Sequence, residues 1–258
     1  MKQRFNIIFA LFAFSLSIFV FGCKQKNKGS APATSGNEQS AYEFEKALYQ
    51  HAYNIGDHMT AIIALNRMLV MDSTQTQYYD SLSRHYIALG NSNSAAYYAE
   101  KALALDPGDV RMLEIAGFIY FDAGDFKKAE EKINKLYQIT KEPKYLYSLS
   151  QVYAYMGDIK KSNEMTDLIL KDGAIDNLYV DVSTSTGQVQ SVRIKAAAYF
   201  VKANLVQNPK TVVSLLGKAL AIQPDFEVAK KIKEEMEVQN KMQEIQNNED
   251  ILNKYKKK

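Results

Sequence analysis

The stretch YYDSLSRHYIALGNSNSAAYYAEKALALDP, from Tyr78 to Pro107, decides the fold of this 258-residue chain. Leucine, tyrosine and alanine recur in it at the spacing of amphipathic helices on both sides of Gly90-Asn91. Glycine ends a helix readily in the left-handed conformation, and Asn caps the next helix by accepting backbone N–H groups. Pro107 then stops the second helix. The stretch therefore predicts a helix, a tight turn and a second helix.

The same pattern returns along the chain at a nearly constant period. Its turn glycines are spaced 34, 34 and 33 residues apart, and an Asp or Asn follows each of them. A small residue stands five positions after each glycine, and a tyrosine stands four positions before all but the first. The period and these residues resemble the tetratricopeptide repeat (TPR), a helix-turn-helix unit. The residues are Gly56, Gly90, Gly124 and Gly157; Ala61, Ala95, Ala129 and Ser162; and Ala52, Tyr86, Tyr120 and Tyr153.

The resemblance implies an all-α fold, a right-handed α-solenoid of about five TPR units. Residues 41–174 hold the first four units, and 193–226 hold a degenerate fifth one with Gln207-Asn208-Pro209 in place of the turn glycine. Pro107 and Pro224 fall where the second helix of a unit ends, and Pro143 lies two residues beyond that position. Each unit is expected to bury its apolar faces against its neighbours.

Two segments interrupt or follow the repeats. In residues 175–192, Tyr179–Val182 and Gln188–Val192 are rich in β-formers and predict a small hairpin. Its role is left open between a spacer in the solenoid and a partner-contact element. Residues 227–258 predict a C-terminal helix with a basic tail, whose first turns shield the last repeat and for which Asp225 is the expected cap.

The N-terminus carries a different signal. Two cations precede the apolar run from Phe5 to Phe21, which indicates a secretory signal or a short membrane anchor. Val20-Phe21-Gly22-Cys23 resembles a bacterial lipobox, although Phe21 departs from its commonest form. The resemblance implies a lipoprotein signal peptide at 1–22 and a covalent lipid on Cys23. Cys23 is the one cysteine of the chain, so no internal disulfide can form.

The residues after Cys23 predict a lipidated, flexible tether at 23–40, because they hold no aromatic or branched aliphatic side chain. Lys24 stands where an aspartate would resemble an inner-membrane retention signal, which favours the outer membrane, facing the periplasm. The covalent lipid is the only expected cofactor.

Charge excludes one class of function. The chain has 32 basic and 29 acidic residues, and removal of Lys2 and Arg4 with the signal would leave it nearly neutral. Such a balance gives no indication of nucleic-acid binding. The basic end at Lys254–Lys258 is interpreted as solvated, or as a contact with anionic lipid or glycan.

We find no catalytic or metal motif in the sequence. The histidines are His51, His58 and His85. His51 and His85 occupy the same slot of successive units, too far apart to share a metal, so they are expected to be packing residues. The prediction is that the chain is not an enzyme.

In TPR proteins the first helix of each unit lines a concave groove, and this resemblance places aromatic and polar residues there. The alternative is that adjacent helices or the tail cover these aromatics. The lysine and asparagine of a chaperone-type carboxylate clamp are not matched, since Gln50 follows Lys46 and Arg84 follows Asp80. The predicted partner-binding groove consists of Tyr53, Arg84, Phe118, Phe121, Tyr147, Gln151 and Tyr155.

The sequence thus predicts a membrane-anchored scaffold or adaptor of the bacterial cell envelope. It would bind a peptide or helix of another envelope protein, for example in a pilus, secretion or motility complex. An adaptor that regulates a peptidoglycan hydrolase and a self-associating, homo-oligomeric solenoid remain as alternatives.

Overall fold

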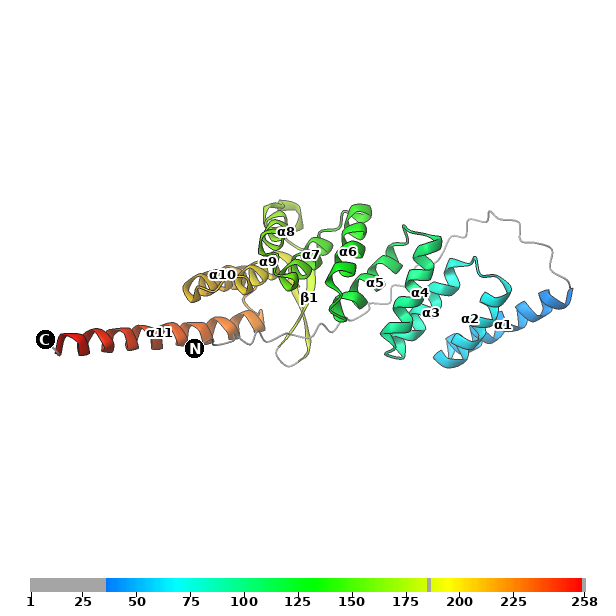
Figure 1. Cartoon of the computed structure of the whole chain (residues 1–258), viewed down its shortest axis with the longest axis horizontal. Coiled ribbons are helices and arrows are strands. Elements are labelled where there is room, and N and C mark those ends of the chain that lie inside the picture. Colours follow the sequence, from blue (N-terminus) through cyan, green and yellow to red (C-terminus); the bar gives the residue numbers. More distant parts are fainter. Residues whose placement is uncertain (1–35, 185–186, 257–258) are drawn as a thin grey trace. The chain divides into compact units, whose positions relative to one another are not determined.

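A computed structural model of the chain describes residues 36–184 and 187–256, with side chains for 38–184 and 187–246 (Figure 1). The predicted signal peptide, Cys23 and most of the predicted tether lie outside the described residues. None of the described helices combines the length and hydropathy that a membrane span requires.

The described residues form two compact units, divided between Thr140 and Lys141. In each unit every helix packs against the next one along the chain. The N-terminal unit consists of α1 (Gly36–Asn54), α2 (His58–Met71), α3 (Thr76–Ala88), α4 (Ser92–Leu105), α5 (Val110–Asp122) and α6 (Phe126–Thr140). The C-terminal unit consists of α7 (Pro143–Met156), α8 (Ile159–Lys171), the 3₁₀ turn η1 (Gly173–Ile175), β1 (Tyr179–Ser183), β2 (Val189–Arg193), α9 (Ile194–Asn204), α10 (Pro209–Ile222) and α11 (Glu227–Lys256). The predicted solenoid of helix pairs with a small hairpin is confirmed.

The turn inside each pair has the predicted chemistry. The four turn glycines have φ between +71° and +77°, the left-handed region that other residues rarely adopt. The N–H of the residue after each glycine donates back to the carbonyl five positions earlier, as from Asn91 to Tyr86 at 2.8 Å. The side chain of Asn91 then caps α4 by accepting from the Ser94 N–H. Asp57, Asp125 and Asp158 accept at the other three turns.

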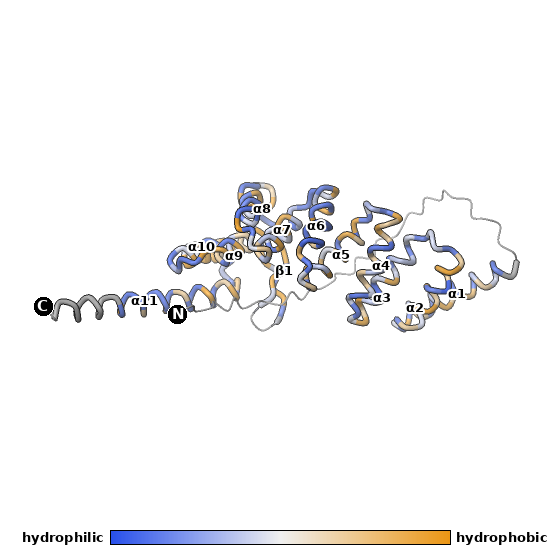
Figure 2. Tube along the Cα trace, in the orientation of Figure 1, coloured by the Kyte–Doolittle hydropathy of each residue, from blue (hydrophilic) through white to orange (hydrophobic). Residues whose placement is uncertain are grey.

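Close approach of the two helices in a pair depends on small residues. A Cβ at Gly117 of α5 would lie 2.8 Å from Cγ1 of Ile133 on α6, so only glycine fits there. At the matching place in the second pair, the Ser83 hydroxyl donates to the Ala95 carbonyl at 2.9 Å. Ala95, Ala99 and Ala102 of α4 are fully buried, which lets the backbones pack closely. Figure 2 shows hydrophobic and hydrophilic stretches alternating along these helices, as amphipathic packing requires.

One predicted boundary differs from the structure. Helix α1 begins at Gly36, so residues 36–40 of the predicted tether are helical. Glu38 lies in the first turn, where the N-terminal end of a helix favours a negative charge. Pro143, in contrast, lies just beyond the end of α6 at Thr140, as predicted, and is also the first residue of α7. Proline suits this position because the first N–H groups of a helix have no partner within it.

The degenerate fifth repeat is a helix pair, as predicted. Without a turn glycine, α9 ends in an αR conformation at Leu205. Asn208 then caps α10 by accepting from the N–H groups of Lys210 and Thr211, and Pro209 is its first residue. Asn208 and Pro209 therefore begin α10 where the other pairs have a Gly-Asp or Gly-Asn turn.

The hairpin is fastened to the turn between α10 and α11. In the antiparallel pair of β1 and β2, Val180 lies opposite Val192. The Gln223 side chain accepts from the Arg193 N–H at 2.7 Å and donates to the Ser191 carbonyl at 3.2 Å. Gln223 thus completes the outer edge of β2 as a neighbouring strand would.

A second glutamine replaces the cap predicted for the last helix. The Gln190 Oε1 atom accepts from the Glu227 N–H at 3.0 Å, and its Nε2 atom donates to the Asp225 carbonyl at 2.6 Å. The predicted cap Asp225 therefore contributes its backbone, while the capping side chain comes from β2. As predicted, the first turns of α11 pack on the last repeat: Phe226 and Ala229 are fully buried. Farther along, Val238, Met242 and Ile245 are exposed.

Candidate functional site

The first helices of the three N-terminal pairs carry four of the predicted site residues. Tyr53 lies on α1, Arg84 on α3, and Phe118 and Phe121 on α5. Tyr53 is 48% exposed and its ring meets the edge of the His85 ring at a centroid distance of 6.1 Å. We call the surface made by these four residues with Asp80 and Arg111 the A-helix face.

Two arginines share one carboxylate on this face. Asp80 accepts from the Arg84 Nε atom at 3.1 Å and from the Arg111 Nη1 atom, on the next A helix, at 2.8 Å. The Arg111 side chain is 58% exposed, so these ion pairs add little to stability. Their consequence is electrostatic: the three side chains together keep one surplus positive charge, and Asp80 holds both guanidinium groups in place between α3 and α5.

The two phenylalanines of α5 are half-buried. The Phe121 ring packs edge-on against Phe126 of α6, with centroids 5.8 Å apart. Part of each aromatic surface is therefore used within the helix pair, and the remainder is open to contact.

The remaining predicted residues lie on α7, in the C-terminal unit, and one of them was wrongly assigned to the groove. Tyr147 is only 2% exposed, because α7 packs against both α8 and α9 and eight of its fourteen residues are buried. Burial raises the pKa of Tyr147, and its hydroxyl accepts from Gln151 Nε2 at 3.2 Å. Tyr147 is a core residue and Gln151 supports it. Tyr155 is 39% exposed and stays a candidate contact residue.

Sequence reasoning missed a histidine pair. His58, the first residue of α2, and His85 of α3 have their Nδ1 atoms 2.9 Å apart. Of the two histidines expected to be packing residues, His85 is buried, but the prediction was wrong for His51, which is exposed. His85 is buried, and its desolvation, with the charges of His58 and Arg84, lowers its pKa to about 4. The signal that could have found this pair is the position of His58 directly after the turn.

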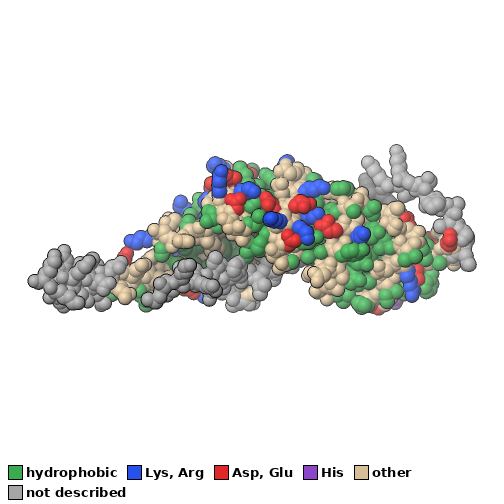
Figure 3. Space-filling view, in the orientation of Figure 1, with side chains coloured by type: hydrophobic (Ala, Val, Ile, Leu, Met, Phe, Trp, Pro, Cys, Tyr) green, Lys and Arg blue, Asp and Glu red, His purple; other side chains and the backbone are tan. Residues whose placement is uncertain are grey.

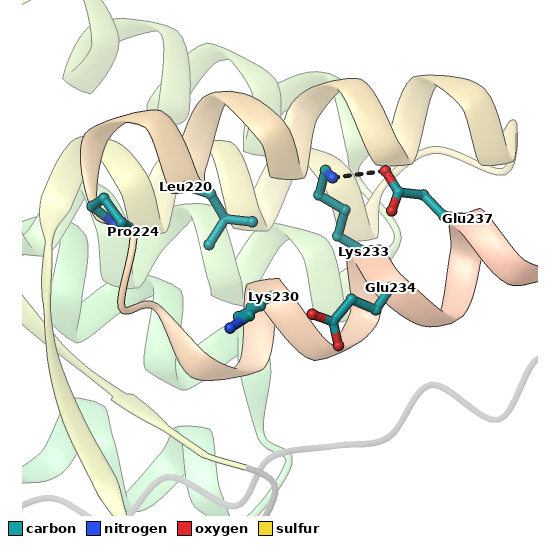
Figure 4. A pocket seen from close by; sticks show the side chains of 6 residues that line it. All are labelled: Leu220, Pro224, Lys230, Lys233, Glu234 and Glu237. Carbon is teal, nitrogen blue, oxygen red and sulfur yellow. Dashed lines mark hydrogen bonds and ion pairs between the residues drawn. The ribbon is translucent and has the colours of Figure 1, made fainter.

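A shallow cleft of about 290 Å³ lies between α10 and α11 (Figure 4). Leu220 and Pro224 form its apolar part, and on the α11 side Lys233 is paired with Glu237, one turn farther along the helix, at 2.7 Å. Lys230 and Glu234 complete its lining. With equal numbers of lysines and glutamates around two apolar residues, the lining of the cleft carries no net charge that would attract a ligand.

Within the part of the chain that the structure describes, no three His, Cys, Asp or Glu side chains gather as a metal site would require. What the described site can do is bind: it presents aromatic rings and fixed guanidinium groups on a rigid stack of helices.

Comparison with known proteins identifies the fold class. No protein-family model matches the chain. Tetratricopeptide repeat protein 37 of Xenopus laevis is 22% identical over 212 residues; the match covers 80% of this chain and 13% of that protein. The crystal structure of MamA has a TM-score of 0.53 at 20% identity, over 72% of this chain and 93% of MamA. YrrB, a TPR protein with an unusual peptide-binding site, has a TM-score of 0.59 at 15% identity, over 78% of this chain and all of YrrB. The chain therefore has the fold of a TPR solenoid.

Proposed function

We propose that this chain is a membrane-anchored scaffold of the bacterial cell envelope that binds a segment of a partner protein on its A-helix face. The observation that carries this proposal is the composition of that face. Exposed Tyr53 and half-buried Phe118 lie on the same series of first helices as Arg84 and Arg111, and aromatic and arginine side chains are the residues enriched in binding hot spots. The peptide-binding site of YrrB, which shares the fold, supports the same use of this one.

The recognition chemistry is non-covalent. Partner side chains are buried against the aromatic rings, and the two arginines, with their surplus positive charge, fix the register of an extended or helical segment by hydrogen bonding to its carbonyl or carboxylate groups. The chain itself catalyses nothing, needs no cofactor and binds no nucleic acid in this proposal. An assembly role in a pilus, secretion or motility complex fits such a scaffold.

A lipid on Cys23 anchors the scaffold in this proposal, on the periplasmic side of the outer membrane. The supporting observations are the lipobox-like Val20-Phe21-Gly22-Cys23 and the lysine at position 24. Several acyl chains on one residue provide stable attachment, whereas a single chain binds only reversibly.

Crosslinking in cells, followed by purification of the tagged chain from the membrane fraction, tests the proposal. The Tyr53→Ala/Phe118→Ala variant should recover at least about tenfold less partner than the wild type, because loss of two hot-spot side chains costs several kcal/mol. Arg111→Glu, at a residue 58% exposed, should act alike without disturbing the core. Tyr179→Ala is the matched control, since Tyr179 of β1 is 47% exposed against 48% for Tyr53.

Equal recovery with all variants would refute the A-helix face as the site, and a loss confined to Tyr179→Ala would move it to the hairpin. A Cys23→Ala arm tests the anchor separately. This variant should leave the membrane fraction; if it stays there after signal cleavage, the lipid anchor is wrong while the binding face stands.

A further inference from the structure

The outward side of α2 is apolar. Asn66 points toward α4, because its Oδ1 accepts from the Tyr98 hydroxyl at 3.0 Å, and Arg67 points toward α1, because it pairs with Glu45 at 3.0 Å. Successive residues of a helix are rotated by about 100° about its axis. Residues whose side chains lie between the directions of Asn66 and Arg67, opposite the buried side of α2, therefore point away from both α1 and α4. They are Met59, Ile63 and Val70, which are 58%, 47% and 89% exposed.

The outward side of α4 carries two further exposed apolar side chains. Tyr98 points toward α2, and Glu100 points toward α6, where it pairs with Lys132 at 2.9 Å. Between these directions lie Tyr97 and Leu105, which are 55% and 47% exposed, together with the polar residues Asn93, Ser94 and Lys101. Lys101 stands over the Tyr97 ring at 5.4 Å from its centroid. We call Met59, Ile63, Val70, Tyr97 and Leu105 the α2–α4 outer face.

The third helix pair of the same unit shows that the fold does not require exposed apolar side chains on the outward side of the second helix. Helix α6 holds the equivalent position, but its outward side is charged: Lys127, Lys128, Glu131 and Lys135 are all exposed. In Figure 3 hydrophobic and uncharged surface is intermixed over α1 to α4 with few charged side chains, whereas charged side chains gather over α6. Neighbouring exposed apolar side chains of this kind mark a contact surface.

We infer that the α2–α4 outer face rests on the surface of a lipid bilayer. The cations next to this face are Lys101, over the Tyr97 ring, and Arg67, at its border and paired with Glu45. Between the border residues of α2 and of α4, whose side chains are all described, no acidic residue lies in the outward sector. Aliphatic side chains with flanking cations suit an interfacial contact with anionic headgroups, and a tyrosine ring suits the headgroup level.

The anchor of the proposed function supplies the proximity, and for this step the inference rests on that proposal. Cys23 precedes Gly36, the first residue of α1, by thirteen positions. A chain of that length reaches at most about 45 Å when fully extended. A lipid on Cys23 would therefore keep α1 and α2 close to the membrane, where a weak contact acts at high effective concentration.

The test uses the chain from Lys24 to Lys258, which keeps every described residue and lacks both Cys23 and the apolar run before it. It is floated with vesicles of phosphatidylethanolamine containing a minor part of phosphatidylglycerol. The wild type should float, and Ile63→Glu/Val70→Glu should float at least about fivefold less. Ile139→Glu is the matched control, because Ile139 of α6 is 46% exposed on the charged outward side and Ile63 is 47% exposed.

Because Ile63 and Val70 are exposed, the double variant should keep the helical circular dichroism of the wild type, and Tyr97→Glu reports on the same face from α4. A wild type that stays with the soluble fraction, or variants that float as well as it does, would overturn the inference. Neither result would bear on the proposed lipid anchor, which the Cys23→Ala variant tests separately in cells.

Discussion

At the residue scale, His85 shows how a buried imidazole is held neutral. Only one of the two facing Nδ1 atoms of His58 and His85 can carry the proton of their hydrogen bond. Tyr49 and Tyr53 of α1 present their rings to His85 at centroid distances of 6.0 and 6.1 Å. The side chains around the imidazole thus favour its neutral form, and Arg84, the adjacent residue, disfavours a second charge.

This arrangement predicts a pH-dependent stability. The pKa of His85 is about 4 in the folded chain and near 6.5 when unfolded, so the unfolded state binds more protons between these values. The free energy of unfolding should therefore fall as pH falls from 6.5 to about 4, by up to roughly 3 kcal/mol. Urea unfolding followed by circular dichroism at several pH values measures this. His85→Gln should flatten the dependence, and His51→Gln should not; equal dependence in all three proteins would contradict the assignment.

Residues whose roles are decided locally could be predicted from the sequence. The turn glycines and their capping Asp or Asn act within a few positions of chain, and all four turns behave as expected. Tyr147 could not be placed correctly, because its burial depends on how many helices cover α7. The His58–His85 contact was missed for a similar reason. The position of a residue within the repeat indicates which helix carries it, but not which side chain of a neighbouring helix it contacts.

At the element scale, the hairpin is stabilised from outside. Two strands are marginal by themselves, and here Gln223 pairs with the edge of β2 while Gln190 caps α11. The alternation of apolar residues was enough to predict the strands. Their fastening was not predictable, because each glutamine meets backbone groups about thirty or more positions away in the sequence.

Gln223→Ala should loosen β2. The Arg193 N–H and the Ser191 carbonyl would lose their partners, at a cost of about 1–3 kcal/mol. Hydrogen–deuterium exchange should therefore speed up roughly tenfold or more across β2. Gln188→Ala, at an exposed residue beside the hairpin turn, is the control and should exchange like the wild type. Unchanged protection of β2 in Gln223→Ala would show that the valines alone hold the strand in place.

At the scale of the whole chain, stability should be local to each unit. The repeat period predicted pairs of helices, but no residue pattern predicted the division at Thr140–Lys141. Each unit has its own buried side chains, such as Leu82 with Leu65 and Met68 in the first and Leu149 with Phe226 in the second. In a solenoid, where a repeat contacts only its neighbours, damage to one such core should spread little.

Leu82→Ala tests this directly in the full chain. Leu82 is fully buried, so its truncation should cost about 2–5 kcal/mol. Hydrogen–deuterium exchange should accelerate in peptides from residues 36–140 and stay at wild-type rates in 141–256. Leu149→Ala, at a residue 1% exposed, should show the reverse pattern. If either substitution accelerates exchange equally in both ranges, the chain unfolds as one cooperative body. A partner bound on the A-helix face would then stabilise the C-terminal unit as well, because binding to the folded state shifts an unfolding equilibrium that both units share.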